Sequence, residues 1–252
     1  MPARAVDAAV AVLILRDWRS HVLWPTLIAA LVFAVLVLGL LDRPIARVFF
    51  YDAANGWLGA GAGDWWAHRI LHSGGRWVVR AVAFAALLSW LASFRVAALA
   101  AWRREALYVF VAMTAATVLV GLLKLVTNVD CPWDLSGFGG THPYVMLFND
   151  RPDYLARAKC FPGAHSSSGF ALMSLYFALR QRHRKAAYVA LTIGIFVGVA
   201  FAIGQEARGA HFLSHDVTSA ALVWFLLIVL YDWMLLPRAS RVADVVGAAV
   251  AG

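Results

Sequence analysis

Long apolar runs alternate with short polar connectors along most of the chain. Six of these runs approach the roughly 20 residues that a helix needs to cross a bilayer. They predict membrane-spanning helices at about 21–41, 76–94, 106–127, 166–179, 186–203 and 216–236. No repeat or long low-complexity linker separates them, so we expect one all-α domain over residues 1–252, built as a bundle of six transmembrane helices.

Two parts of this pattern are less regular. The run at 166–179 is short, and it reaches spanning length only if Arg180 and Gln181 extend their polar ends to the interface or the bilayer thins. The first fifteen or so residues resemble a signal peptide, but charged residues follow them and no clear small-residue cleavage site is present. We therefore expect a retained N-terminal helix lying in the membrane interface.

Positive charge is predicted to collect on one face of the membrane. With six spans, the same side receives Arg4, Arg16, Arg19, Arg95, Arg103, Arg104, Arg180, Arg182, Arg184, Lys185, Arg238 and Arg241. The positive-inside rule makes that side cytoplasmic, together with both termini. Connectors 42–75, 128–165 and 205–215 then open on the other face. For a chain without eukaryotic targeting signals, the simplest expectation is the bacterial inner membrane, with these connectors in the periplasm.

The composition supports a bilayer partner and argues against nucleic acid. The chain is 62% hydrophobic and only 14% charged, with a net charge of +8. Its cations lie in short connectors, where topology and anionic lipids explain them, so no nucleic-acid partner is expected. The oligomeric state stays open.

The connector at 42–75 is rich in aromatic residues: Phe49, Phe50, Tyr51, Trp57, Trp65 and Trp66. Aromatic side chains in such a setting favour the headgroup zone. Two interpretations stay open, a structural interfacial belt and a wall that guides a lipid toward a site.

Cys131 and Cys160 are the only cysteines, and both fall in the connector at 128–165. An oxidising compartment would permit them to pair, which closes a loop of about 30 residues and stabilises the fold by roughly 3 kcal/mol. Two buried free thiols are the alternative.

Three short polar islands interrupt the apolar pattern, at 124–132, 162–166 and 208–216. In the first, Lys124 lies near the end of an apolar run, where an unpaired ammonium is costly. It either extends to the interface as a helix anchor or places a positive charge against phosphate oxygens. The neighbouring islands favour the phosphate role.

The second island precedes an apolar helix and contains Gly163, His165 and Ser166. The first amides of a helix lack internal partners and attract anions, so a phosphate can dock there. His165 would then protonate a leaving oxygen. The alternative is a Ser-rich helix cap with a loop histidine.

The third island contains Arg208, His211, His215 and Asp216. Residues four apart share a helix face, so His215 could touch His211, and Asp216 is also within possible reach. A carboxylate on Nδ1 would orient His211 and leave Nε2 as a nucleophile toward phosphorus. A His pair at this spacing could also chelate zinc, but no acidic or cysteine cluster accompanies it, so we expect no metal.

Together, the islands resemble the tripartite signature of the type 2 phosphatidic acid phosphatase (PAP2) superfamily: Lys, six residues, Arg-Pro; then Pro-Ser-Gly-His; then Ser-Arg, five residues, His, three residues, Asp. The match spans 124–216. The resemblance implies that Lys124 binds phosphate, His165 is the general acid and His211 is the nucleophile, with an acidic partner and without a metal or other cofactor.

The chain departs from this signature at several positions. Cys131 stands where the first Arg is expected, Gly163 where the Ser is expected, Gln205 where the second Arg is expected, and His215 where the Asp is expected. Lysine does not reproduce the paired contacts of a guanidinium with phosphate. The candidates to replace the missing guanidinium groups are Arg208 and, from the outer loop, Arg151, Arg157 and Lys159.

The resemblance implies a membrane phosphatase that hydrolyses a lipid phosphate or a polyprenyl or lipid diphosphate through a phosphohistidine, in a divergent bacterial branch. Capture of the phosphoryl group by a second lipid, which would make the protein a phosphotransferase, is the first alternative. A catalytically inactive lipid-binding or transport protein on the same scaffold is the second.

Overall fold

The computed structural model of the protein describes residues 18–37 and 41–236. Most of them are helical, in the order η1 (Arg19–Leu23), α2 (Trp24–Val37), α3 (Asp42–Phe49), η2 (Gly61–Gly63), η3 (Trp65–Gly74), α4 (Gly75–Ala92), α5 (Ala97–Ala100), α6 (Arg103–Thr127), η4 (Pro132–Asp134), α7 (Ala164–Phe170), η5 (Ala171–Met173), α8 (Ser174–Leu179), α9 (Arg184–Ala207) and α10 (Leu213–Leu235). Strands β1 (Tyr51–Asp52) and β2 (Gly56–Trp57) form a small antiparallel hairpin. The predicted N-terminal interfacial helix falls on residues outside this range.

Five helices in the described part of the chain are long and apolar enough to cross a membrane: Arg19–Val37, Trp65–Ala92, Arg103–Asp134, Arg184–Ala207 and Leu213–Leu235. They match five of the six predicted spans. The remaining one, predicted at 166–179, corresponds to a helical segment at 164–179 across α7, η5 and α8, which is shorter than a bilayer requires. Most of its residues are buried among the long helices, and its crossing of the membrane stays a prediction.

The second span begins earlier than the hydrophobic pattern predicts. We expected it from position 76, yet the helix already starts at Trp65 and runs through η3 into α4. Gly75 does not interrupt it, because its backbone angles are helical, with φ −56° and ψ −38°. This glycine also allows close helix packing, since a Cβ there would lie 2.4 Å from the ring of Phe201 in α9. The second half of the expected connector is therefore helical and lies against the end of α9.

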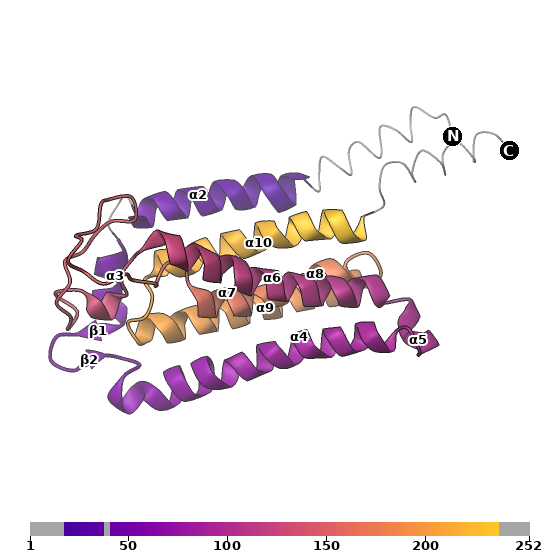
Figure 1. The fold of residues 1–252 in the computed structure, drawn as a ribbon, viewed down its shortest axis with the longest axis horizontal. Coiled ribbons are helices and arrows are strands. Elements are labelled where there is room, and N and C mark those ends of the chain that lie inside the picture. Colours follow the sequence, from indigo (N-terminus) through magenta and orange to yellow (C-terminus); the bar gives the residue numbers. More distant parts are fainter. Residues whose placement is uncertain (1–17, 38–40, 237–252) are drawn as a thin grey trace.

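The long helices form an elongated bundle in which α6 to α10 occupy the centre (Figure 1). Helix α2 packs along α10, and α4 packs against α6. Helix α3, the hairpin and the loop between α6 and α7 gather at one end, while α5 lies at the other (Figure 1). The ends of α6 and α9 and the starts of α7 and α10 meet at the loop end, so all three polar islands lie there.

Glycines bring the short helix α7 close against α9. A Cβ at Gly198 of α9 would lie 2.2 Å from the ring of Phe170, and one at Gly169 would lie 2.8 Å from Cα of Gly198. Since the start of α7 carries the second island, this close packing sets the position of that island relative to the end of α9.

Part of the aromatic connector covers the start of α10. Trp57 stacks on Phe138 with ring centroids 5.4 Å apart, and Phe138 meets Phe212 edge-on at 5.9 Å. Phe49 and Trp65, in contrast, are 66% and 60% exposed, as expected of an interfacial belt. The connector thus provides both a buried cap over the polar end of the bundle and exposed aromatic rings beside it.

Candidate functional site

A buried histidine and carboxylate form the centre of the polar end. Nδ1 of His211 lies 2.7 Å from Oδ1 of Asp216, and the two residues are only 5% and 2% exposed. A carboxylate in this position fixes the orientation of the ring and favours the imidazolium that forms during catalysis. The other ring nitrogen, Nε2, is then the atom that can act as a nucleophile.

Residues from the second island hold Asp216 in place. The hydroxyl of Ser166 donates to Oδ1 of Asp216 at 2.5 Å and also contacts the carbonyl of Gly163 at 3.1 Å. That carbonyl also accepts a hydrogen bond from Ser219 of α10 at 2.8 Å. The hydroxyl of Ser166 thus orients the carboxylate of Asp216. The substrate-binding role expected of Ser166 stays a prediction.

The rings of His211 and His215 lie beside each other with centroids 6.0 Å apart, and His215 also packs edge-on against Phe161 and Phe212. The two histidines do not share a helix face, because His211 precedes α10 and the intervening Phe212 is extended. Asp216, and not His215, is therefore the side chain that bonds to His211. A catalytic role of His215 stays a prediction.

His165 lies at the start of α7, near enough to His211 for their charges to interact. Its Nε2 is 3.0 Å from the carbonyl of Leu71 in η3, and its ring stacks on Phe201 with centroids 4.2 Å apart. A carbonyl can only accept, so Nε2 carries a proton, and Nδ1 is the nitrogen left for exchange with a substrate.

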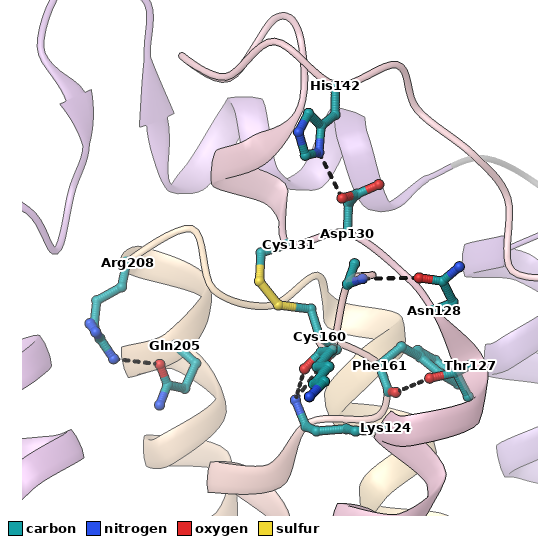
Figure 2. The surroundings of a disulfide bond; sticks show 12 residues. Lys124, Thr127, Asn128, Asp130, Cys131, His142, Cys160, Phe161, Gln205 and Arg208 are labelled. Atoms are coloured by element: carbon teal, nitrogen blue, oxygen red, sulfur yellow. Dashed lines mark hydrogen bonds and ion pairs between the residues drawn. A yellow bond between two sulfur atoms is a disulfide. The ribbon is translucent and has the colours of Figure 1, made fainter. Parts of the chain in front are cut away.

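Lys124 reaches from the end of α6 toward the start of α7. Its ammonium donates to the carbonyls of Lys159 and Cys160 at 2.9 and 3.2 Å, and it also interacts electrostatically with Asp216. Cys160 is bonded to Cys131 in a disulfide, with Cα atoms 5.1 Å apart (Figure 2). The predicted pairing is thus present. It links Cys131, just after α6, to the segment at residues 159–160 whose carbonyls bond to Lys124.

Gln205, at the position of a signature arginine, bridges two basic side chains. Its Oε1 accepts from Nη1 of Arg208 at 2.8 Å (Figure 2), and its Nε2 lies 2.6 Å from Nδ1 of His72. The ring of His72 is 4.6 Å from that of His165. Partial burial lowers the pKa of Arg208 but leaves it a cation.

The loop arginines are largely engaged in structural contacts. Arg151 donates to both carboxylate oxygens of Asp130, at 2.6 and 3.0 Å, and to the carbonyls of Leu155 and Ala156. Arg157 donates to the carbonyl of Leu125. These contacts organise the loop, and of the candidate replacements only Arg208 lies in the chain of contacts that leads to His165.

Asp42 is a further buried acid at this end, and it caps α10 from a distant part of the chain. Its two oxygens accept from the N–H and the hydroxyl of Ser214, at 3.0 and 2.5 Å. Burial raises the pKa of Asp42 to about 6, against the opposing effect of these hydrogen bonds. Since Ser214 lies between His211 and Asp216, Asp42 fixes the turn that brings those two residues together.

Among the residues that the structure describes, no three His, Cys, Asp or Glu side chains are grouped to hold a metal ion. The buried contact between His211 and Asp216 suits a nucleophilic attack by His211 on an anion.

A protein-family model described as the PAP2 superfamily matches residues 105–238, more than half of the chain. The chain belongs to the PAP2 superfamily. Comparison with curated proteins and with solved structures gives no match. Members of the PAP2 superfamily are phosphatases, and membership supports the hydrolysis of phosphoric esters of lipids.

Sequence reasoning missed several residues of this PAP2 site. It treated Leu71, His72 and Asp42 as parts of an interfacial connector, and it did not consider Glu206, which is buried and interacts with Asp216. One signal was available, since His68, His72 and Arg76 recur every fourth position, as residues on one helix face do. The other contacts join segments far apart in the chain and leave no local pattern.

Proposed function

We propose that this PAP2 protein hydrolyses a lipid phosphate or diphosphate through a phosphohistidine at His211. The observation that carries the proposal is the buried 2.7 Å contact between Nδ1 of His211 and Oδ1 of Asp216. It orients a ring whose Nε2 can attack phosphorus, and it offsets the positive charge that this ring gains.

The reaction proceeds in two balanced steps. In the first, Nε2 of His211 forms a bond to phosphorus while the bond from phosphorus to the leaving oxygen breaks, and His165 gives that oxygen a proton. In the second, His165 takes a proton from water, the resulting hydroxide attacks phosphorus, and the phosphorus–nitrogen bond breaks to release phosphate. Lys124 stabilises the charge on the phosphoryl oxygens.

We further propose that the bundle crosses the membrane six times, with 164–179 as the short span, and lies in the bacterial inner membrane. The three islands share one end of the bundle (Figure 1). The short connectors that lead into α6 and α9 lie at the other end and carry Arg95, Arg103, Arg182 and Arg184, of which Arg182 pairs with Glu105 at 3.2 Å. The positive-inside rule then supports a periplasmic site and cytoplasmic termini.

A phosphate-release assay on the purified full-length protein tests the activity. The substrates are phosphatidic acid, phosphatidylglycerophosphate, undecaprenyl diphosphate and lipid A, each with and without EDTA. We expect EDTA-resistant turnover that His211→Ala abolishes and that vanadate inhibits. His183→Gln is the matched control, because His183 stacks on Trp102 in the connectors at the other end of the bundle. Turnover by His211→Ala at the parent rate would refute the mechanism.

A further inference from the structure

A second group of polar side chains lies beside His165, apart from the His211–Asp216 pair. It consists of Gln205 and Arg208 at the end of α9 and His72 and Arg76 on the helix formed by η3 and α4. We propose that Gln205 positions Arg208 and His72, and that these two groups, with Arg76, bind the second phosphate of a lipid diphosphate. This inference rests on the proposed function and deepens it by naming the substrate class.

Gln205 fixes the direction of both of its neighbours. Because Oε1 accepts from Arg208, the amide nitrogen is the group that faces Nδ1 of His72, and it must donate to it. An Nδ1 that accepts carries no proton, so the neutral ring of His72 bears its proton on Nε2. The amide thus holds one guanidinium and presents one imidazole N–H as a donor, a combination that suits phosphate oxygens.

Close packing of the two helices makes this link possible. A Cβ at Gly204 would lie 3.0 Å from Cδ1 of Leu71 and 3.2 Å from its Cβ. Gly204 stands next to Gln205 and Leu71 next to His72, so the near contact of the first pair brings the second pair within hydrogen-bond distance. The same packing places the carbonyl of Leu71 against His165.

Positive charge gathers at this place without an equal number of available carboxylates. Arg76 follows His72 by one helical turn, and the charges of Arg76 and Arg208 interact with each other and with His165. Asp64 is the carboxylate that interacts with Arg208, but it already contacts His68 at 3.2 Å and Arg69 at 3.3 Å. Two guanidinium groups that repel each other form a favourable site for an anion between them.

The position of these cations beside His165 indicates which part of a substrate they meet. His165 is the proposed acid for the leaving oxygen, so the groups around it contact the leaving group. In a lipid diphosphate, His211 bonds to the terminal phosphorus and the bond from that phosphorus to the bridging oxygen breaks. The bridging oxygen keeps the electron pair of the broken bond and takes a proton from His165, and a lipid monophosphate departs. Arg76 and Arg208 neutralise its remaining charge, which an alcohol leaving group lacks.

The test compares a lipid diphosphate with the monophosphate of the same lipid chain. For Arg76→Gln and Gln205→Leu, we expect kcat/KM for the diphosphate to fall about tenfold or more, the effect of losing a hydrogen bond to a charged group. We expect the value for the monophosphate to change by less than about threefold. Arg69→Gln is the matched control on the same helix, since its side chain is 78% exposed, and it should alter neither substrate.

An equal fall for both substrates, or no fall for either, would overturn the subsite. Binding of methylenediphosphonate, which phosphatases cannot cleave, gives a second measurement that needs no turnover. Its Kd should rise about tenfold in Arg76→Gln and Gln205→Leu, while the Kd for inorganic phosphate stays constant. If the wild type binds the diphosphonate in this manner but hydrolyses no lipid, the proposed function fails and the subsite stands.

Discussion

Gly163 lies so close to Asp216 that a Cβ at position 163 would be only 2.4 Å from Oδ1 of the carboxylate. The same Cβ would lie 2.7 Å from the hydroxyl of Ser166 and 2.9 Å from Nδ1 of His211. The backbone at Gly163 therefore closes directly over the hydrogen bonds that orient the proposed nucleophile. A serine, which the PAP2 signature has at this position, does not fit here without displacing Asp216.

Gly163→Ala is expected to reduce both activity and stability. The methyl group must push Asp216 away from His211, and overpacking of this kind costs about 1–3 kcal/mol. We expect kcat/KM for the best lipid substrate to fall at least about tenfold, together with a lower thermal midpoint. Gly121→Ala in α6 is the control, because a Cβ there meets nothing within 4 Å and alanine favours the helix. Equal behaviour of the two variants would contradict the prediction.

Asp216→Asn and His215→Gln separate the two candidate partners of His211. An asparagine at 216 cannot stabilise an imidazolium, so we expect kcat to fall on the order of 10³-fold or more. Ser166→Ala removes one hydrogen bond to Asp216 and should cost about tenfold. His215→Gln should affect mainly the thermal midpoint, because His215 packs against Phe161 and Phe212. A larger kcat loss in His215→Gln than in Asp216→Asn would assign the supporting role to His215.

The disulfide is expected to stabilise the outer loop and the position of Lys124. Cys131 and Cys160 are 29 residues apart, so replacing both by serine should lower the free energy of unfolding by roughly 3 kcal/mol. Turnover should fall as well, because Lys124 donates to the backbone carbonyl of Cys160 and the disulfide holds that segment in place. Thermal unfolding with and without reductant checks this. Reductant should lower the thermal midpoint of the wild type to that of the double variant and leave the midpoint of the variant unchanged. A wild-type midpoint that reductant does not change would contradict the prediction.

Asp42 gives the stability of the protein a specific pH dependence. The pKa of its carboxyl is about 6 in the fold, against 3.8 for an aspartate free in water. Between these values the folded state binds more protons than the unfolded state, so the free energy of unfolding falls as the pH rises. The full effect is on the order of 3 kcal/mol, reached near pH 7.

Asp42→Asn removes this titration and retains an oxygen acceptor for Ser214. Thermal midpoints of wild type and variant, measured between pH 4 and pH 7, give the contribution of Asp42 as their difference. We expect the variant to gain stability relative to the wild type as the pH rises. A difference that is independent of pH would show that Asp42 does not titrate in this window.

The membrane bundle and the general location of the site follow from sequence alone. Apolar runs of spanning length predicted five helices that the structure contains, with ends that differ mostly by a few residues, as for 106–127 against Arg103–Thr127. The alternation of these runs also placed the three islands at one end of the bundle. Both predictions depend only on runs of neighbouring residues and on the order of these runs along the chain, and the sequence gives both without a structure.

The partners within the site depend on contacts between distant segments. Helical spacing left both His215 and Asp216 open as partners of His211, and the fold makes Asp216 the residue that bonds to Nδ1. In the same way, the sequence shows Gln205 only as a glutamine at the position of a signature arginine. In the fold it connects Arg208 with His72 from another helix.

The sequence by itself thus determined the membrane-protein class, the PAP2 resemblance and the candidates His165, His211 and Lys124, and it left the cysteine pair as one of two alternatives. The tertiary structure decided that Asp216 orients His211, that Ser166 supports Asp216 and that the second span begins at Trp65. The physical reason is that each of these contacts depends on how closely two helices approach and on the turn at which each begins. Small residues such as Gly75, Gly163 and Gly204 set that approach, and their effect becomes visible only when the facing helix is in place.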